Sequence, residues 1–118
     1  MLPDVFTQLR NIMLPYAGRL VCVSDTGDEL SLNTRHIQKN KQPLWFGGVK
    51  IQKHYVSYYL MPVYINLALL KTTSPALKKR MQGKSCFNFS SLDEALFAEL
   101  ARLTEAGFRD YQEQGYVE

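Results

Sequence analysis

The middle of the chain lacks acidic residues. Residues 35–90 contain no Asp or Glu, although the 118-residue chain has 11 acids, 14 bases and a net charge of +3. This segregation predicts an anion-attracting face if the basic side chains share one side of the fold, and merely a well-solvated domain if they do not. The acid-free segment contains these bases: Arg35, Lys39, Lys41, Lys50, Lys53, Lys71, Lys78, Lys79, Arg80 and Lys84.

Cysteines and long apolar runs are also scarce. Cys22 and Cys86 are far apart, and the N-terminal segment carries Asp4 within an amphipathic pattern instead of an apolar leader. We therefore expect a cytoplasmic protein with two buried free thiols and no disulfide. The longest apolar run, residues 55–70, is interrupted by polar residues and a proline, and it is shorter than the roughly 20 residues of a membrane span. We expect no association with a membrane.

Motifs for common chemistries are missing. Gly83-Lys84-Ser85 resembles the end of a phosphate-binding loop, but Lys78 stands where the first glycine is needed, and a strand follows where a helix should begin. Two cysteines and two histidines have no zinc-ligand spacing. Cys86 has no histidine placed by the sequence to act as its base, so a structural thiol is expected. These absences favour a non-catalytic protein.

Hydrophobic periodicity predicts a helix first and then several strands. Leu2, Val5, Leu9 and Ile12 recur at helical spacing until Pro15 ends the pattern. Alternating and β-branched runs follow, separated by turn residues and by a polar segment that predicts an exposed loop. The expected elements are a helix over 3–14, strands over 20–24, 29–34, 44–51 and 55–61, a loop over 35–42, and a short helix or turn over 63–70.

The remaining third predicts helix, strand and helix. Ser74 and Pro75 are typical of a helix start, and Gly83 stands where a helix ends in a left-handed residue, so a helix is expected over 75–82. A short strand is expected over 86–89. Ser91 and Glu94 form a capping box that begins a long helix over 92–114.

These elements predict one domain over residues 1–118. Consecutive strands with short connections favour antiparallel pairing. The expected fold is α+β: an antiparallel sheet of about five strands, with the N- and C-terminal helices packed on it in two layers.

The run Lys79–Phe89 resembles the YdhG-like family of small bacterial domains of unknown function. The similarity extends through residues 45–49, 60–64, 74–75 and 97–100, and so covers most of the chain. It implies a compact cytoplasmic domain that is frataxin-like in outline. It also implies an alternative function, because some relatives are associated with intracellular iron delivery. Iron prefers carboxylate and imidazole ligands, and only Asp4, Asp25, Asp28 and Glu29 are available as an acidic ridge near the N-terminus.

The preferred hypothesis is a binding module with a basic, aromatic-lined pocket for a small anionic molecule or an acidic protein surface. No cofactor is expected, although iron belongs to the alternative. Trp45 and several tyrosines interleave with lysines, as in single-strand nucleic-acid binders, but a pI of 8.9 is only mildly basic and argues against nucleic acid. The oligomeric state is left open. The predicted ligand-binding residues are Trp45, Lys50, Ser57, Tyr59, Arg80, Lys84, Ser85 and Asn88.

Overall fold

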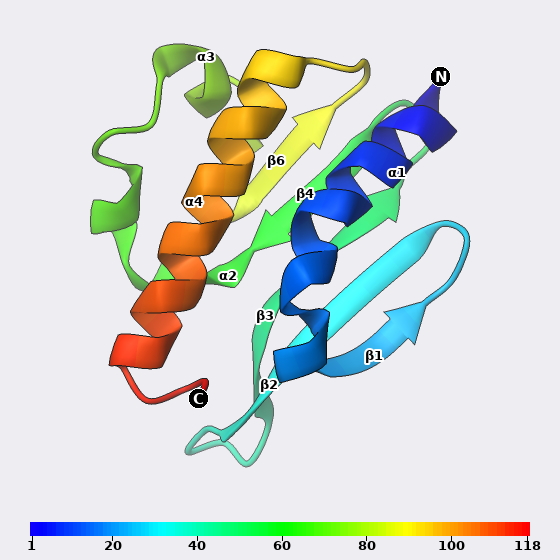
Figure 1. Cartoon of the computed structure of the whole chain (residues 1–118). Helices are drawn as coiled ribbons and strands as arrows, with labels where there is room; N and C mark the ends of the chain where they lie inside the picture. The colour runs from blue at the N-terminus through cyan, green and yellow to red at the C-terminus, as the bar shows by residue number, and fades with distance from the viewer.

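The computed structural model describes residues 1–118 as helices on one antiparallel sheet (Figure 1). Two long helices lie at the two ends of the chain, one short helix follows the first of them, and the other short helices lie between the fourth and the fifth strand. In chain order, the elements are α1 (Leu2–Met13), the 3-10 helix η1 (Leu14–Arg19), β1 (Val21–Asp25), β2 (Glu29–Ile37), β3 (Pro43–Ile51), β4 (Val56–Leu60), α2 (Met61–Ile65), the 3-10 helix η2 (Leu67–Leu70), α3 (Pro75–Lys78), β5 (Met81–Gln82), β6 (Cys86–Phe89) and α4 (Glu94–Glu113).

The sheet has six strands in the order β1-β2-β3-β4-β6-β5, and every neighbouring pair is antiparallel. The predicted α+β class and the antiparallel sheet with terminal helices are therefore confirmed. About five strands were expected, and the sheet has one more. The additional strand, β5, has only two residues, which is too few to show an alternating pattern in the sequence.

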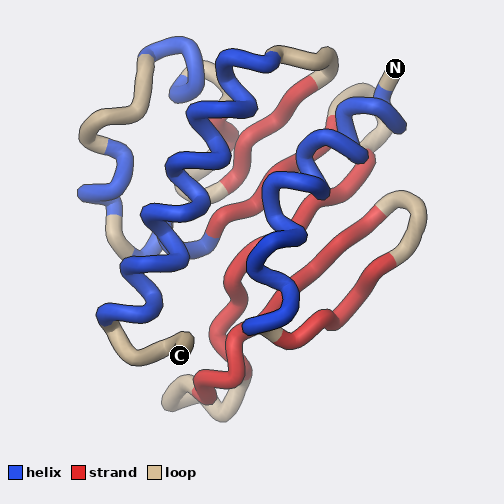
Figure 2. Tube along the Cα trace, viewed as in Figure 1, coloured by secondary structure: helices blue, strands red, loops and turns tan.

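Helices α1 and α4 run side by side across the same face of the sheet (Figure 2). Inward side chains of the strands and the apolar stripes of both helices form one core of 24 buried residues. Phe46 contacts both Phe108 and Tyr111 of α4 edge to face, and Phe89 contacts Phe97 in the same way. Burial of these aromatic surfaces fixes α4 on the sheet.

Two glycines let backbone segments approach closely. A Cβ at Gly47 would overlap the carbonyl oxygen of Tyr59 on β4, and the register between β2 and β3 shifts beside it. Glycines inside a strand typically mark such a close approach of another backbone segment. Gly107 of α4 lies against Pro62 of α2, whose Cβ would be 2.9 Å from an added Cβ, and Leu60 of β4 lies next, at 4.0 Å.

The predicted helix over 75–82 was too long. Ser74 does cap it, since its hydroxyl accepts a hydrogen bond from the N–H of Leu77 at 3.1 Å, but α3 ends at Lys78. Met81 and Gln82 instead pair with β6. Gly83 adopts the left-handed φ of +78° between these two strands, so it forms a strand turn and not a helix stop.

Two other boundaries differ from the sequence analysis. Strand β2 continues to Ile37, within the expected loop, because Ile37 pairs with Pro43 and the Thr34 hydroxyl donates to the Leu44 carbonyl at 2.8 Å. Helix α4 is capped by Asp93, whose carboxylate accepts from the N–H of Leu96, and not by Ser91. In both places a hydrogen bond that the local sequence pattern did not indicate decides where the element ends or begins.

Candidate functional site

The side of the sheet opposite α1 and α4 carries most of the predicted binding residues. We call it the open face and define it by the outward side chains of the four central strands. The register aligns Gly48, Tyr59 and Cys86 in one row across the sheet, and Lys50, Ser57 and Asn88 in the next. The open face comprises Ser31, Trp45, Lys50, Ser57, Tyr59, Cys86 and Asn88.

Two aromatic side chains lie together on the open face. The rings of Trp45 on β3 and Tyr59 on β4 have centroids 5.4 Å apart and planes tilted by 45°. The indole N–H of Trp45 donates to the Ser31 hydroxyl at 3.0 Å, and the ring lies against the backbone of Gly48. The indole is therefore held along the sheet surface, while both aromatic residues stay only half-buried.

Asn88 is the centre of a polar network on the same face. Its side-chain oxygen accepts from the Ser57 hydroxyl at 2.7 Å and from the Cys86 thiol at 3.3 Å. Its amide group donates to the Gln82 side chain at 2.8 Å. These bonds join β4, β6 and β5, so the outward polar side chains have defined positions.

A recess of about 330 Å³ opens beside this network, at the end of β4 and β6. Arg80 and Asn88, two of the predicted residues, both line it, and Lys79 and His54 add further basic groups. The Arg80 carbonyl accepts a hydrogen bond from the Asn88 N–H at 2.8 Å, which fixes the backbone under the arginine. The full lining is His54, Tyr55, Lys79, Arg80, Met81, Gln82, Asn88 and Ser90, with no acidic member. We call it the basic recess.

The basic residues of the acid-free segment have no acidic partners. Only two ion pairs form, Arg10 with Asp25 at 2.8 Å and Arg109 with Glu105 at 2.6 Å, and both arginines lie outside residues 35–90. Neither Arg80 nor Lys84 pairs with an acid of the last helix. The charges of Arg80 and Lys79 are therefore free to meet an external anion.

The predicted cations do not all meet. Lys84 lies beyond the turn at Gly83, with its ammonium group 5.9 Å from the ring centre of Tyr64 on α2. Lys50 extends from the open face, and neither lysine lines the basic recess. Ser85 does not line the basic recess either. Its backbone carbonyl accepts a hydrogen bond from the Leu60 N–H at 2.8 Å.

The two thiols are free, as expected, but Cys22 is exposed and Cys86 is only half-buried. Cys22 is exposed because β1 forms the edge of the sheet. Burial raises the pKa of the Cys86 thiol above its usual value, an effect that the Ser57 and Tyr59 hydroxyls partly offset. A raised pKa lowers the thiolate fraction at neutral pH and disfavours nucleophilic use of Cys86.

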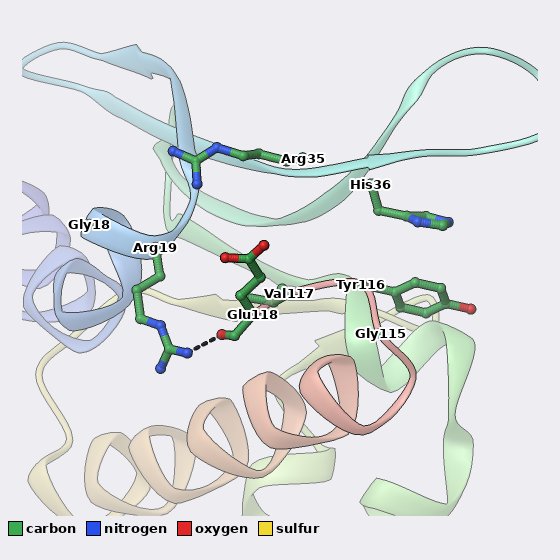
Figure 3. A pocket seen from close by; sticks show the side chains of 8 residues that line it. All are labelled: Gly18, Arg19, Arg35, His36, Gly115, Tyr116, Val117 and Glu118. Atoms are coloured by element: carbon green, nitrogen blue, oxygen red, sulfur yellow. Dashed lines mark hydrogen bonds between the residues drawn. The ribbon is translucent and has the colours of Figure 1, made fainter.

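A second hollow, of about 340 Å³, lies between η1, β2 and the C-terminal residues (Figure 3). Arg19, Arg35 and His36 face it, and Glu118 lies between the two arginines. Arg19 donates to the backbone carbonyl of Glu118 and stands over the Phe108 ring at 5.1 Å, while His36 stacks on Tyr116 with centroids 4.6 Å apart. Arg19 and His36 already have partners within the chain, whereas Arg35, like the cations of the basic recess, has no acidic partner.

The acidic ridge required by the iron alternative is largely engaged in local contacts. Asp25 pairs with Arg10, the Asp28 carboxylate accepts from the Thr26 hydroxyl at 2.7 Å, and the Glu29 carboxylate accepts from the Ser24 hydroxyl at 3.0 Å. No three side chains of His, Cys, Asp or Glu gather closely enough to hold a metal ion.

Comparison of the chain with protein-family models, curated proteins and solved structures finds no match. None of the helices combines the length and the apolar character that crossing a membrane requires.

Sequence reasoning missed part of the recess lining. Lys79 and Gln82 come from one segment and His54 from another, and only the folded sheet brings them beside Asn88. Gln82 had no signal in the sequence, because β5 has only two residues and the segment was assigned to a helix. The open face itself could be predicted from the sequence, because Tyr55, Ser57 and Tyr59 alternate with apolar residues along the segment that forms β4.

Proposed function

We propose that this domain is a non-catalytic binding module that takes an anionic ligand at the basic recess. The observation that supports the proposal is the pair of adjacent cations, Lys79 and Arg80, in a recess with no acidic side chain and no ion pair. Asn88 and His54 supply hydrogen-bonding groups beside them. An arginine guanidinium binds phosphate and carboxylate oxygens through two parallel hydrogen bonds, which suits a phosphorylated or carboxylated ligand.

The polar network behind the recess supports the same function. Asn88 is fixed by Ser57 and Gln82, so it needs little reordering when a ligand arrives. Preorganisation of this kind lowers the entropy cost of binding. A cytoplasmic location, a small anion or an acidic protein surface as partner, and membership of the YdhG-like family all belong to this proposal.

Calorimetric titration with pyrophosphate tests the proposal. Arg80→Gln removes the guanidinium and should weaken binding by about tenfold or more, as expected for a charge-assisted hydrogen bond of about 1.5–3 kcal/mol. Lys84→Gln is the matched control, because it removes the same charge outside the recess and should change affinity little. Absence of pyrophosphate binding, or equal losses in the two variants, would overturn the proposal.

Iron delivery, the alternative implied by the family resemblance, gains no support from the positions of the acids. Asp25, Asp28 and Glu29 each interact with a neighbouring side chain. Titration with Fe(II) remains its direct test, and saturable heat above the buffer level would revive it.

A further inference from the structure

We infer that the anionic ligand is a single-stranded nucleic acid, which binds along the open face with its phosphates at the basic recess and its bases stacked on Trp45 and Tyr59. The inference rests on the proposed function, because the recess must bind phosphate. It adds a named surface and a chemical class of ligand. The carrying observation is the continuity of an aromatic pair, a polar network and an unpaired basic recess on one uncovered side of the sheet.

The aromatic pair has the geometry of a stacking platform. Trp45 is held along the sheet by its bond to Ser31 and by its contact with Gly48, so one face of the indole is turned away from the backbone. Tyr59 lies beside it at 5.4 Å on the next strand. Aromatic side chains in this arrangement stack successive bases without reading their sequence.

The charges continue from this platform to the recess. Lys50 lies on the open face opposite Ser57, whose neighbour Asn88 lines the recess together with Arg80. Three strand spacings of about 4.8 Å separate β3 from β5, a distance of about 14 Å that a few extended nucleotides cover. Glu29 is the only acid among the outward residues of the paired strands β2 to β6, and it is already bound by Ser24.

The exposed edge groups of the open face also suit single strands. Bases of a single strand are free to stack on side chains and to hydrogen-bond along their Watson–Crick edges, whereas the faces and Watson–Crick edges of duplex bases are already occupied. Asn88 and Gln82 offer amide groups in the recess, and Lys50 offers an ammonium group on the open face. The mild overall basicity that argued against nucleic acid is an average over the chain, whereas the basic recess has no acidic side chain in its lining.

Fluorescence of the single tryptophan provides a direct test, because all indole emission comes from Trp45. The protein is titrated with an oligothymidylate and an oligouridylate of about eight nucleotides, within the usual range of single-strand site sizes. We expect saturable quenching of Trp45 emission. We also expect an affinity that falls with salt, since each phosphate contact contributes about 0.7 to the slope of the logarithmic plot.

Variants separate stacking from charge. Tyr59→Leu should weaken binding of a labelled oligonucleotide by about fivefold to a hundredfold, the usual loss for one stacked base, while Tyr59→Phe retains the ring and should bind as the wild type does. Tyr64→Leu is the matched control, because Tyr64 is 54% exposed on α2, away from the open face. Arg80→Gln should lower the salt slope by about one phosphate contact and leave the quenching at saturation unchanged.

Three results would overturn the inference. In the first, pyrophosphate binds, but the oligonucleotides bind no tighter than a polyphosphate and leave Trp45 emission unchanged. The recess would then be an anion site that does not bind nucleic acid. A duplex or poly-glutamate could bind equally well and quench equally, which would show that stacking of bases is not involved. Tyr59→Leu and Tyr59→Phe could bind alike. If neither pyrophosphate nor an oligonucleotide binds, the proposed function fails as well.

Discussion

The hydroxyl of Tyr111 on α4 donates a hydrogen bond of 2.8 Å to the backbone carbonyl of Trp45 on β3. The last helix thus holds the sheet at the residue whose indole lies on the open face. Tyr111 is fully buried and also contacts Phe46 edge to face. The position of Trp45 therefore depends on the core as well as on Ser31.

Tyr111→Phe should lower the free energy of unfolding by about 1–2 kcal/mol, because the ring stays but the Trp45 carbonyl loses a partner. Urea denaturation followed by Trp45 fluorescence measures this change. Tyr64→Phe removes an exposed hydroxyl and should have an effect of less than about 0.5 kcal/mol. Equal stability of Tyr111→Phe and the wild type would contradict a structural role for the bond.

Gly48→Ala should displace the indole of Trp45. An added Cβ would lie 2.5 Å from the Leu30 carbonyl oxygen and 3.2 Å from Cζ2 of Trp45, so the strand or the ring must move. Overpacking of this kind typically costs about 1–3 kcal/mol. A lower melting temperature with a shifted emission maximum is expected, whereas Gly27→Ala, where no atom lies within 4 Å, should change neither.

Tyr58 and Thr104 test the value of a buried hydroxyl pair. Their oxygens lie 2.7 Å apart, and the Thr104 hydroxyl also donates to the Leu100 carbonyl at 2.8 Å, so Tyr58 acts as the donor between the two. Thr104→Val leaves the Tyr58 hydroxyl buried without a partner and should cost about 1–3 kcal/mol. Tyr58→Phe removes the hydroxyl that donates and leaves no buried donor without a partner, so it should cost less. A thermal melt in which Tyr58→Phe is the less stable of the two variants would refute this donor assignment.

Glu99 should make stability depend on pH. Hydrogen bonds from the Ser74 hydroxyl at 2.6 Å and the Ser74 N–H at 2.7 Å hold the pKa of the Glu99 carboxyl below its usual value of 4.5. Because the folded pKa is the lower one, the stabilisation is present above the unfolded value and is lost as pH falls through the folded pKa. Glu99→Gln removes this contribution.

Urea midpoints of the wild type and Glu99→Gln, measured from pH 7 to pH 3, check the effect. Their difference should be largest at neutral pH and should shrink once the pH falls below about 4.5. Ser74→Ala removes one of the two donors and should reduce the pH-dependent part. A difference that stays constant over the whole range would show that Glu99 does not contribute by ionisation.

Local patterns predicted those elements whose stability is local. The apolar stripe of α1 and the alternation of β4 each depend on a few neighbouring residues, and they appear where expected. The segment after Ser74 shows the limit, because its cap was predicted but its end was not. Lys79 and Arg80 favour a helix locally, yet Met81 and Gln82 gain more from pairing with β6.

The sequence was sufficient to predict the open face of the sheet, but it was not sufficient to predict the basic recess. Alternation along β4 and β6 places Ser57, Tyr59 and Asn88 on one side without any knowledge of the neighbours. The approach of His54 to Asn88 depends on the pairing of β4 with β6, which joins residues 34 positions apart, whereas Lys79 reaches Asn88 through the pairing of β5 with β6. The first pairing has no local signature, and the second was hidden by the helix expected over 75–82, so Lys84 was selected where Lys79 lines the recess.

Because both long helices cover the same side of the sheet, packing and recognition draw on alternate residues of the same strands. Substitutions at outward positions leave nearly all buried contacts intact. Relatives could thus exchange one ligand for another through changes at a handful of outward residues and still fold alike. An engineer could use the same freedom, keeping the inward residues as a fixed scaffold and varying the outward ones to obtain new specificities.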